Sequence, residues 1–276
     1  MDYDDVVMLI RAGDDGDGLV RLCAALGSGD RLTINGLLLR DEPAIDPVSC
    51  FAIGEAAVGS VLDDIAEATT RLTDAAEAAF RAALMRHDRR GRWVYPHLGE
   101  VSWETARRIR CFDLAVVRRR EGGHADRLLD TLILESGTPC LVLPPAADGP
   151  GMTGHVVLAW DGSREARNAV QAALPLLRHA EKISMVSIDN ESESALASEG
   201  DDMVRHLLCH GVTARWVRLS PGDRSIGDSL LEHCVATGAD LLVMGGYHHR
   251  PMRERILGGA TRTALGHAGM AVLIAH

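Results

Sequence analysis

Short apolar runs alternate with amphipathic segments along the whole chain, and this alternation predicts the fold class. In the second half, the apolar runs predict strands at 155–160, 182–188, 213–219, 240–246 and 271–275. The segments between them place apolar residues at helical spacing, and several begin at Asp or Ser and end at Gly, which is typical of helices. Strands that are apolar on both faces and alternate with helices indicate a parallel sheet that is covered on both sides.

The first half repeats the same order of elements. Its apolar runs predict strands at 5–10, 31–39, 92–98, 112–119 and 137–145, with helices near 14–27, 58–87, 102–110 and 126–136. A stretch rich in Pro and Gly, residues 144–154, separates the halves. We therefore expect an α/β protein with two tandem five-stranded parallel-sheet domains, 1–146 and 153–276, each with strand order 3-2-1-4-5 and helices on both faces.

The fifth strand of each half lies at an edge of its sheet in this order. Both fifth strands, "CLVLP" and "AVLIA", are short and apolar. Because exposed apolar edge strands tend to pair with one another, we predict that the two halves pack around a pseudo-twofold axis through these strands. One chain would then resemble a dimer.

Composition narrows the functional classes. The 276 residues carry a net charge of −10, which weighs against nucleic acid or an anionic membrane surface as the main partner. Lys182 is the only lysine and begins a predicted strand, so chemistry that needs a catalytic lysine is disfavoured. The sequence has no C-x-x-C pair, no apolar run of membrane-spanning length and no signal-peptide pattern. We expect a cytoplasmic protein.

Candidate ligand-binding residues follow strands one and four of the second half. In open parallel sheets, ligands bind at the carboxyl ends of the strands where the strand order reverses. Strand one leads into Asp161-Gly162-Ser163, and strand four leads into Gly245-Gly246. The "GGAT" segment, residues 258–261, opens the last helix, where glycine and free N–H groups suit a phosphate. The same glycines also fit tight packing of that helix on the sheet, so the motif alone leaves both interpretations open.

The second half resembles the universal stress protein family, and the repeat resembles its tandem two-domain form. Nucleotide-binding members carry G-x-x-G, nine residues, and then Gly followed by Ser or Thr. Here Gly245 and Gly258 take the first and third glycine positions, whereas His248 takes the second and Gly259 follows Gly258. The segments "GADLLVMG", "AWDGS" and "AVLIAH" extend the resemblance, which in the first half rests mainly on the order of the repeat.

The resemblance implies specific roles in binding ATP or AMP. Asp161 would lie near the ribose and Ser187 near the adenine, and Met244 and Gly245 would contact the nucleotide. The phosphates would be bound by Gly258, Gly259, Ala260 and Thr261. The resemblance implies a stress-response protein with weak ATPase activity at most and no firmly implied metal, and it leaves a protein partner or a homodimer open. Asp161 also fits a helix N-cap, a role that is compatible with ligand contact.

Two departures from the family pattern shape the expectation. In the first half, Arg11 stands where the second half has Asp161, and "RRREGGHADRLLDTL" stands where it has the glycine-bracketed loop. We therefore expect at most one nucleotide per chain. In the second half, His248 lacks the freedom of glycine, so we expect weak, pH-sensitive binding or none. The alternative function is a stress-response interaction protein that no longer binds nucleotide.

Three further patterns could form a different kind of site. "GDSL", residues 227–230, would make Ser229 a hydrolase nucleophile, but it lies within an amphipathic helical pattern instead of after the first strand. His206 and His210 are four residues apart and could face a metal, but they also suit the last turn of a helix. The adjacent His248 and His249 are better explained by a polar loop.

Common nucleotide-enzyme motifs are absent from the sequence. It has no Walker loop, no G-x-G-x-x-G after a strand, no H-x-G-H and no S-G-G-x-D-S loop after strand one. These absences favour nucleotide binding over nucleotide chemistry.

Overall fold

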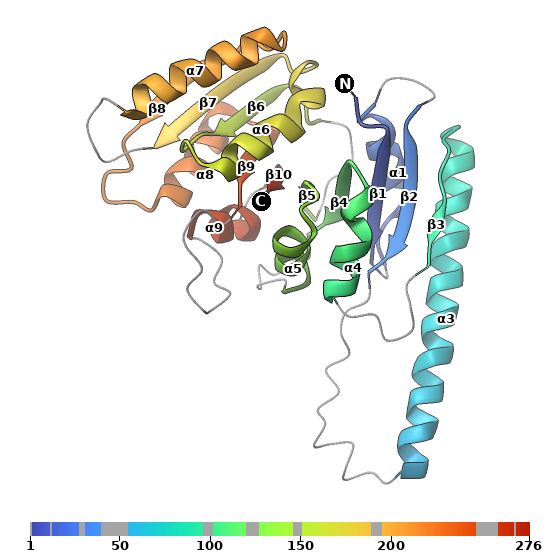
Figure 1. Cartoon of the computed structure of the whole chain (residues 1–276). Coiled ribbons are helices and arrows are strands. Elements are labelled where there is room, and N and C mark those ends of the chain that lie inside the picture. Colours follow the sequence, from blue (N-terminus) through green and yellow to red (C-terminus); the bar gives the residue numbers. More distant parts are fainter. Residues whose placement is uncertain are drawn as a thin grey trace.

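The computed structural model shows two α/β halves joined side by side (Figure 1). It describes residues 2–11, 13–27, 31–39, 55–95, 102–119, 127–145, 151–188, 195–246, 259–267 and 269–276. Strands of the first half are β1 (Asp5–Ile10), β2 (Thr33–Leu38), β3 (Trp93–Val94), β4 (Leu114–Arg118) and β5 (Cys140–Leu143). Strands of the second half are β6 (His155–Ala159), β7 (Lys182–Ile188), β8 (Arg215–Leu219), β9 (Leu241–Gly245) and β10 (Ala271–Ala275).

The ten strands form one sheet in the order β3-β2-β1-β4-β5-β10-β9-β6-β7-β8. Each half therefore has the predicted order 3-2-1-4-5, and each of the ten predicted strands is present. The third strand of the first half is much shorter than predicted. Only Trp93–Val94 of the expected 92–98 is a strand, and residues 96–98 of that range lie outside the described residues.

The halves join through their fifth strands, as predicted. β5 and β10 pair antiparallel, with Leu141 opposite Leu273 and Val142 opposite Val272. Every other strand pair in the described part of the chain is parallel. An antiparallel pair between two parallel sheets is what a twofold axis perpendicular to the sheet requires, so the chain has the internal symmetry of a dimer.

Helices cover both faces of the sheet. One face is covered by α1 (Gly16–Ala24), α3 (Glu55–Arg86), α6 (Arg164–Leu177) and α7 (Ala195–Cys209). The other is covered by α4 (Ser102–Arg108) with the 3-10 turn η1 (Ile109–Cys111), by α5 (Arg127–Ser136), and by α8 (Ile226–Thr237) and α9 (Gly259–His267). The apolar strands thus bury one core cluster on each face, which explains why they are apolar at successive positions.

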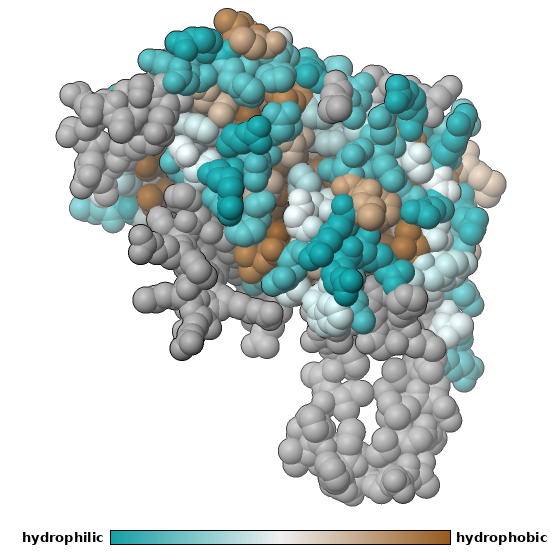
Figure 2. Space-filling view, viewed as in Figure 1, coloured by the Kyte–Doolittle hydropathy of each residue, from teal (hydrophilic) through white to brown (hydrophobic). Residues whose placement is uncertain are grey.

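The face of the molecule that Figure 2 shows is mostly polar. Hydrophilic residues cover most of the visible face over α6 and α7, and apolar residues appear in smaller groups between them (Figure 2). The first turns of α3 extend well beyond the sheet (Figure 1). No helix in the described residues is both long enough and apolar enough to cross a membrane.

The central strand pair gives a direct test of how the halves depend on each other. Leu141 and Leu273 are both 0% exposed and face each other across the β5–β10 pair. We expect Leu141→Ala and Leu273→Ala each to lower the free energy of unfolding by about 2–5 kcal/mol. Because the side chains are direct cross-strand neighbours, their double-mutant cycle should show a coupling of about 0.5–3 kcal/mol in urea denaturation.

The control for this cycle is a distant pair on the same face of the sheet. Phe80 on α3 packs at the far end of the first half. Phe80→Leu and Leu273→Ala should be additive within about 0.5 kcal/mol. Additive losses for the Leu141 and Leu273 pair would contradict the pairing of the fifth strands.

Candidate functional site

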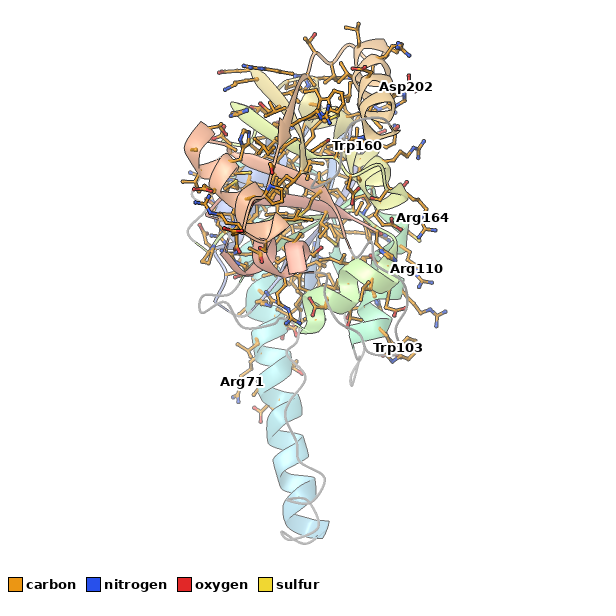
Figure 3. All side chains as sticks on the ribbon, turned by 90° about the vertical axis from the view of Figure 1, so that its left-hand side faces the viewer. Arg71, Trp103, Arg110, Trp160, Arg164 and Asp202 are labelled. Atoms are coloured by element: carbon orange, nitrogen blue, oxygen red, sulfur yellow. The ribbon has the colours of Figure 1, made fainter. Side chains whose placement is uncertain are left out.

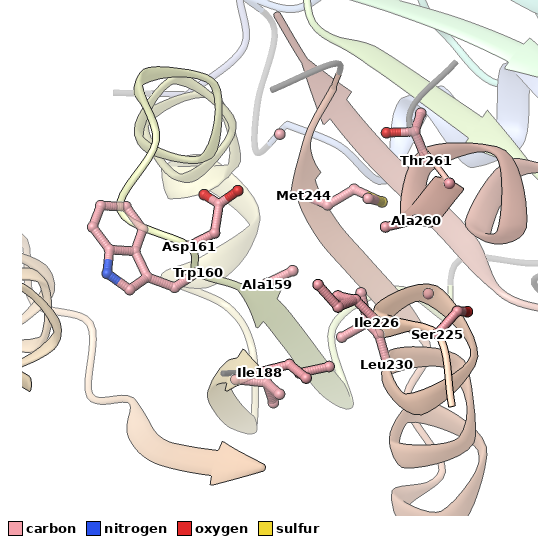
Figure 4. Close-up of a pocket in the computed structure, with 14 residues that line it drawn as sticks. Ala159, Trp160, Asp161, Ile188, Ser225, Ile226, Leu230, Met244, Ala260 and Thr261 are labelled. Carbon is pink, nitrogen blue, oxygen red and sulfur yellow. The ribbon is translucent and has the colours of Figure 1, made fainter. Parts of the chain in front are cut away.

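A cavity of about 330 Å³ opens at the carboxyl ends of the strands in the second half (Figure 4). It lies between β6 and β9, where the strand order reverses. This is the place at which an open parallel sheet binds its ligand. Its lining comes from β6, β7 and β9 and from the first turns of α8 and α9. The lining residues are Ala159, Trp160, Asp161, Val186, Ile188, Ser225, Ile226, Gly227, Leu230, Met244, Gly245, Gly259, Ala260 and Thr261.

The turn after β6 holds Asp161 at the mouth of the cavity. Gly162 takes a positive φ of 75°, which reverses the chain. The Ser163 hydroxyl then accepts a hydrogen bond from the Ala166 N–H at 3.0 Å and caps α6. Asp161 Oδ1 accepts a hydrogen bond from the Ser163 N–H at 3.0 Å. The N-cap role expected as an alternative for Asp161 therefore belongs to Ser163, and Asp161 closes a local turn while its exposed side chain lines the cavity.

Gly245 allows the start of α6 to lie directly on the end of β9. A Cβ atom at this position would stand 2.5 Å from the backbone N of Ala166 and 2.6 Å from the carbonyl carbon of Glu165. Any side chain would push α6 and its capping turn away from β9. Because Gly245 lets α6 lie this close to β9, Asp161 before α6 and Met244 near the end of β9 both line the same cavity.

The first turn of α9 forms the wall opposite Asp161. Gly259, Ala260 and Thr261 begin this helix and line the cavity. The first N–H groups of a helix have no partner within it and carry partial positive charge. A Cβ atom at Gly259 would meet no atom of the described residues within 4 Å. Packing against this described part of the chain therefore does not explain this glycine, in contrast to Gly245.

Ser187 does not take its expected place in the cavity. Its hydroxyl is buried and accepts a hydrogen bond from Trp216 Nε1 at 3.1 Å. Its neighbours Val186 and Ile188 line the cavity instead. Successive residues of a strand point to opposite faces, so the hydroxyl of Ser187 belongs to the face of α7, whereas its neighbours face α8.

Six of the nine expected site residues come together around the cavity. They are Asp161, Met244, Gly245, Gly259, Ala260 and Thr261. Ser187 lies on the adjoining strand with its hydroxyl turned away. His248 and Gly258 lie outside the described residues.

The first turn of α8 is a wall that the sequence reasoning missed. Ser225, Ile226, Gly227 and Leu230 all line the cavity. A Cβ atom at Gly227 would stand 2.8 Å from Thr263 Cβ and 2.9 Å from Ala260 Cα. Gly227 thus brings α8 against α9. The sequence does contain a signal for this wall: Gly227 falls in the first turn of the helix predicted after strand three, where a glycine indicates close packing.

The competing Ser229 site finds no support in this geometry. Ser229 lies in α8 at 9% exposure, and its hydroxyl donates to the Ser225 carbonyl at 3.0 Å. This is a bond to the preceding turn of the same helix. The side chain does not line the cavity, although Gly227 and Leu230 beside it do.

His206 in the last turn of α7 and His210 just after that helix form a pair. The rings of His206 and His210 lie 4.6 Å apart, edge to face. Burial, followed by repulsion from His210, lowers the pKa of His206. Within the described ranges, no group of three His, Cys, Asp or Glu residues is placed to hold a metal ion. His249 lies outside these ranges.

In the first half, a buried arginine lies at the place that corresponds to this opening. Strand pairing in the two halves matches residue by residue, so Arg11 takes the place of Asp161 and Arg118 that of Gly245. Arg11 is 5% exposed, and its Nη1 donates to the Arg118 carbonyl at 2.8 Å. A buried guanidinium therefore spans the ends of β1 and β4 where the second half has an opening.

The comparisons with known proteins agree with this architecture. No protein-family model and no curated protein matches the sequence. Among solved structures, a universal stress protein from Archaeoglobus fulgidus matches with a TM-score of 0.72 at 11% identity, over 99% of this chain and 98% of that one. A putative universal stress protein from Pseudomonas aeruginosa matches with a TM-score of 0.63 at 11% identity, over 99% of this chain and 93% of that one.

Both matches extend over the two halves and the strand pair that joins them. At 11% identity, they establish the fold and leave the ligand of this chain to be argued from its own residues. The resemblance seen in "GADLLVMG" and "AWDGS" is therefore confirmed at the level of architecture. The chain has the fold of a tandem universal stress protein.

Proposed function

We propose that this protein is a cytoplasmic stress-response protein that binds one adenine nucleotide, ATP or AMP, in the cavity of its second half. The observation that carries this proposal is the convergence of Asp161, Gly245 and the first turn of α9 around one opening. The tandem universal stress protein fold supports it. So does the position of the cavity at the reversal of strand order.

The chemistry of the lining fits the three parts of a nucleotide. An apolar wall contributed by Val186, Ile188, Ile226 and Leu230 offers a surface for a planar base. The Asp161 carboxylate suits ribose hydroxyl groups as a hydrogen-bond acceptor. The N–H groups at the start of α9 suit phosphate oxygens. A volume of about 330 Å³ lies at the lower end of the range of about 300–1,000 Å³ that small-molecule pockets occupy.

Binding is a better match to this lining than catalysis. Among the described residues that line the cavity, Asp161 is the only one with an ionisable side chain. A hydrolase would need a nucleophile or a water held by a general base and a group that stabilises the leaving charge. We therefore propose weak ATPase activity at most. If the titrations below show no binding, they would favour the alternative function, a stress-response protein that binds no nucleotide and acts through a protein partner.

The role of Asp161 is tested by removing its charge while keeping its shape. In Asp161→Asn, the side-chain oxygen can still accept from the Ser163 N–H, so the turn should persist. Loss of the charged acceptor should weaken ATP binding about tenfold or more in calorimetry. Asp14→Asn is the matched control, because Asp14 Oδ2 accepts the Arg11 N–H at 2.8 Å in the same turn of the first half. Equal affinities for all three proteins would remove Asp161 from the site.

The stoichiometry tests the asymmetry between the halves. Because the buried Arg11 lies at the corresponding place in the first half, calorimetric titration with ATP or AMP should saturate at no more than one nucleotide per chain. A stoichiometry near two would show that the first half also binds and that Arg11 moves aside.

His248 tests whether the loop before α9 limits affinity. If binding requires a left-handed backbone at this position, histidine costs about 1–2 kcal/mol relative to glycine, or about tenfold in affinity. Protonated imidazole would offset part of this cost by pairing with phosphate below a pH of about 6.5. We therefore expect His248→Gly to tighten ATP binding at pH 8, with less gain at pH 6.

His249→Gly is the matched control, since it changes the neighbouring histidine of the same loop. It should leave the affinity at pH 8 unchanged. Micromolar ATP binding by the unmodified protein, with no gain in His248→Gly, would show that the loop accepts histidine and that this explanation is wrong.

A further inference from the structure

An arginine of the first half binds the helix whose first turn lines the candidate nucleotide site in the second half. Arg119 directly follows β4, and its Nη1 donates to the Leu265 carbonyl at 2.6 Å. Leu265 lies in the last turn of α9. Burial lowers the pKa of Arg119, because desolvation penalises the charged form. The contact therefore lies in a partly water-excluded seam between the halves, where a charged hydrogen bond is strong.

The two ends of α9 serve different halves of the molecule. Its first turn, Gly259 to Thr261, lines the cavity. Its last turn leaves carbonyl groups without helical partners, and a cation at this end also complements the helix dipole. Because α9 has only nine residues, its last turn lies less than two turns from the cavity wall. A shift of the last turn of α9, which Arg119 holds, would therefore also shift the first turn, where the proposed phosphate site lies.

The corresponding helix of the first half is held differently. α5 occupies the place of α9, and the Glu135 carbonyl in its last turn accepts from Arg110 Nη2 at 2.6 Å. Arg110 belongs to the same half as α5, and Figure 3 shows it projecting from that half. Both helices therefore have an arginine on their last turn, but only α9 receives it from across the seam.

The position that matches Arg119 in the second half is Gly246. A Cβ atom there would stand 3.3 Å from Ile274 and 3.4 Å from Ile133 of α5. Glycine has no side chain, so position 246 makes no contact with α5 like that of Arg119 with α9. Among the described residues, this crossing contact runs from the first half, where Arg11 is buried, to the second half, where the cavity lies.

We propose that Arg119 is a positioning residue for the nucleotide site, through which the first half sets the placement of α9 and hence the affinity of the second half. This inference rests on the proposed function. It assigns a role to the first half other than binding a nucleotide of its own.

The test compares Arg119→Ala and Arg119→Lys with Arg110→Ala in the full-length protein. Arg110→Ala removes the same type of bond from the equivalent helix and is the matched control. Two quantities are measured for each variant: ATP affinity by calorimetry at pH 8, and hydrogen exchange of residues 259–267 without nucleotide. Thermal unfolding of each variant confirms that it is folded.

We expect Arg119→Ala to weaken ATP binding about three- to tenfold and to speed exchange in the last turn of α9. Arg119→Lys should restore part of both, because it keeps the charge and a donor. Arg110→Ala should leave both unchanged. Equal effects of Arg119→Ala and Arg110→Ala on ATP binding would indicate general loosening and overturn the inference, as would unchanged affinity in Arg119→Ala.

The two proposals fail in different ways. If the unmodified protein binds no ATP, the proposed function fails, and the exchange data then decide the inference. Faster exchange of α9 in Arg119→Ala, without such a change in Arg110→Ala, would then support the structural part of the inference, that Arg119 positions α9. Unchanged exchange would overturn it.

Discussion

The antiparallel pairing of β5 with β10 is the contact on which the rest of the molecule depends. It joins two parallel five-stranded sheets into one sheet of ten strands and covers two apolar edge strands that would otherwise be open to other chains. It also fixes how the halves face each other. Arg119 can reach the last turn of α9 only because β4 of one half and α9 of the other lie on either side of this seam.

The symmetry of the backbone contrasts with the asymmetry of the side chains. At matching positions, the second half has Asp161 and Gly245, which line an opening, and the first half has a buried Arg11 that donates to the Arg118 carbonyl. This hydrogen bond gives the buried Arg11 guanidinium and the Arg118 carbonyl a protein partner in place of water. The first half also supplies β5, the strand that pairs with β10 of the second half.

Much of this architecture could be predicted from the sequence, because it follows from patterns that are local. Short apolar runs between helical segments gave the strands, and the two apolar fifth strands gave the seam. Ser187 shows where local patterns stop: a shift of one residue along β7 decides which face a side chain takes. The wall from α8 was missed for a related reason, since Gly227 serves a contact with α9 that only the packed helices reveal. The bond of Arg119 to Leu265 joins residues far apart in the sequence, and no motif marks either of them.

Photoaffinity labelling with 8-azido-ATP, followed by mapping of the labelled peptides, tests directly whether the cavity of the second half binds a nucleotide. The azide is attached to the base, so we expect labelling of residues 182–188 or 226–230, beside the apolar wall of the cavity. Unlabelled ATP should compete for this labelling. Labelling that ATP does not displace, or labelling centred on residues 5–11 and 114–118 of the first half, would contradict the account.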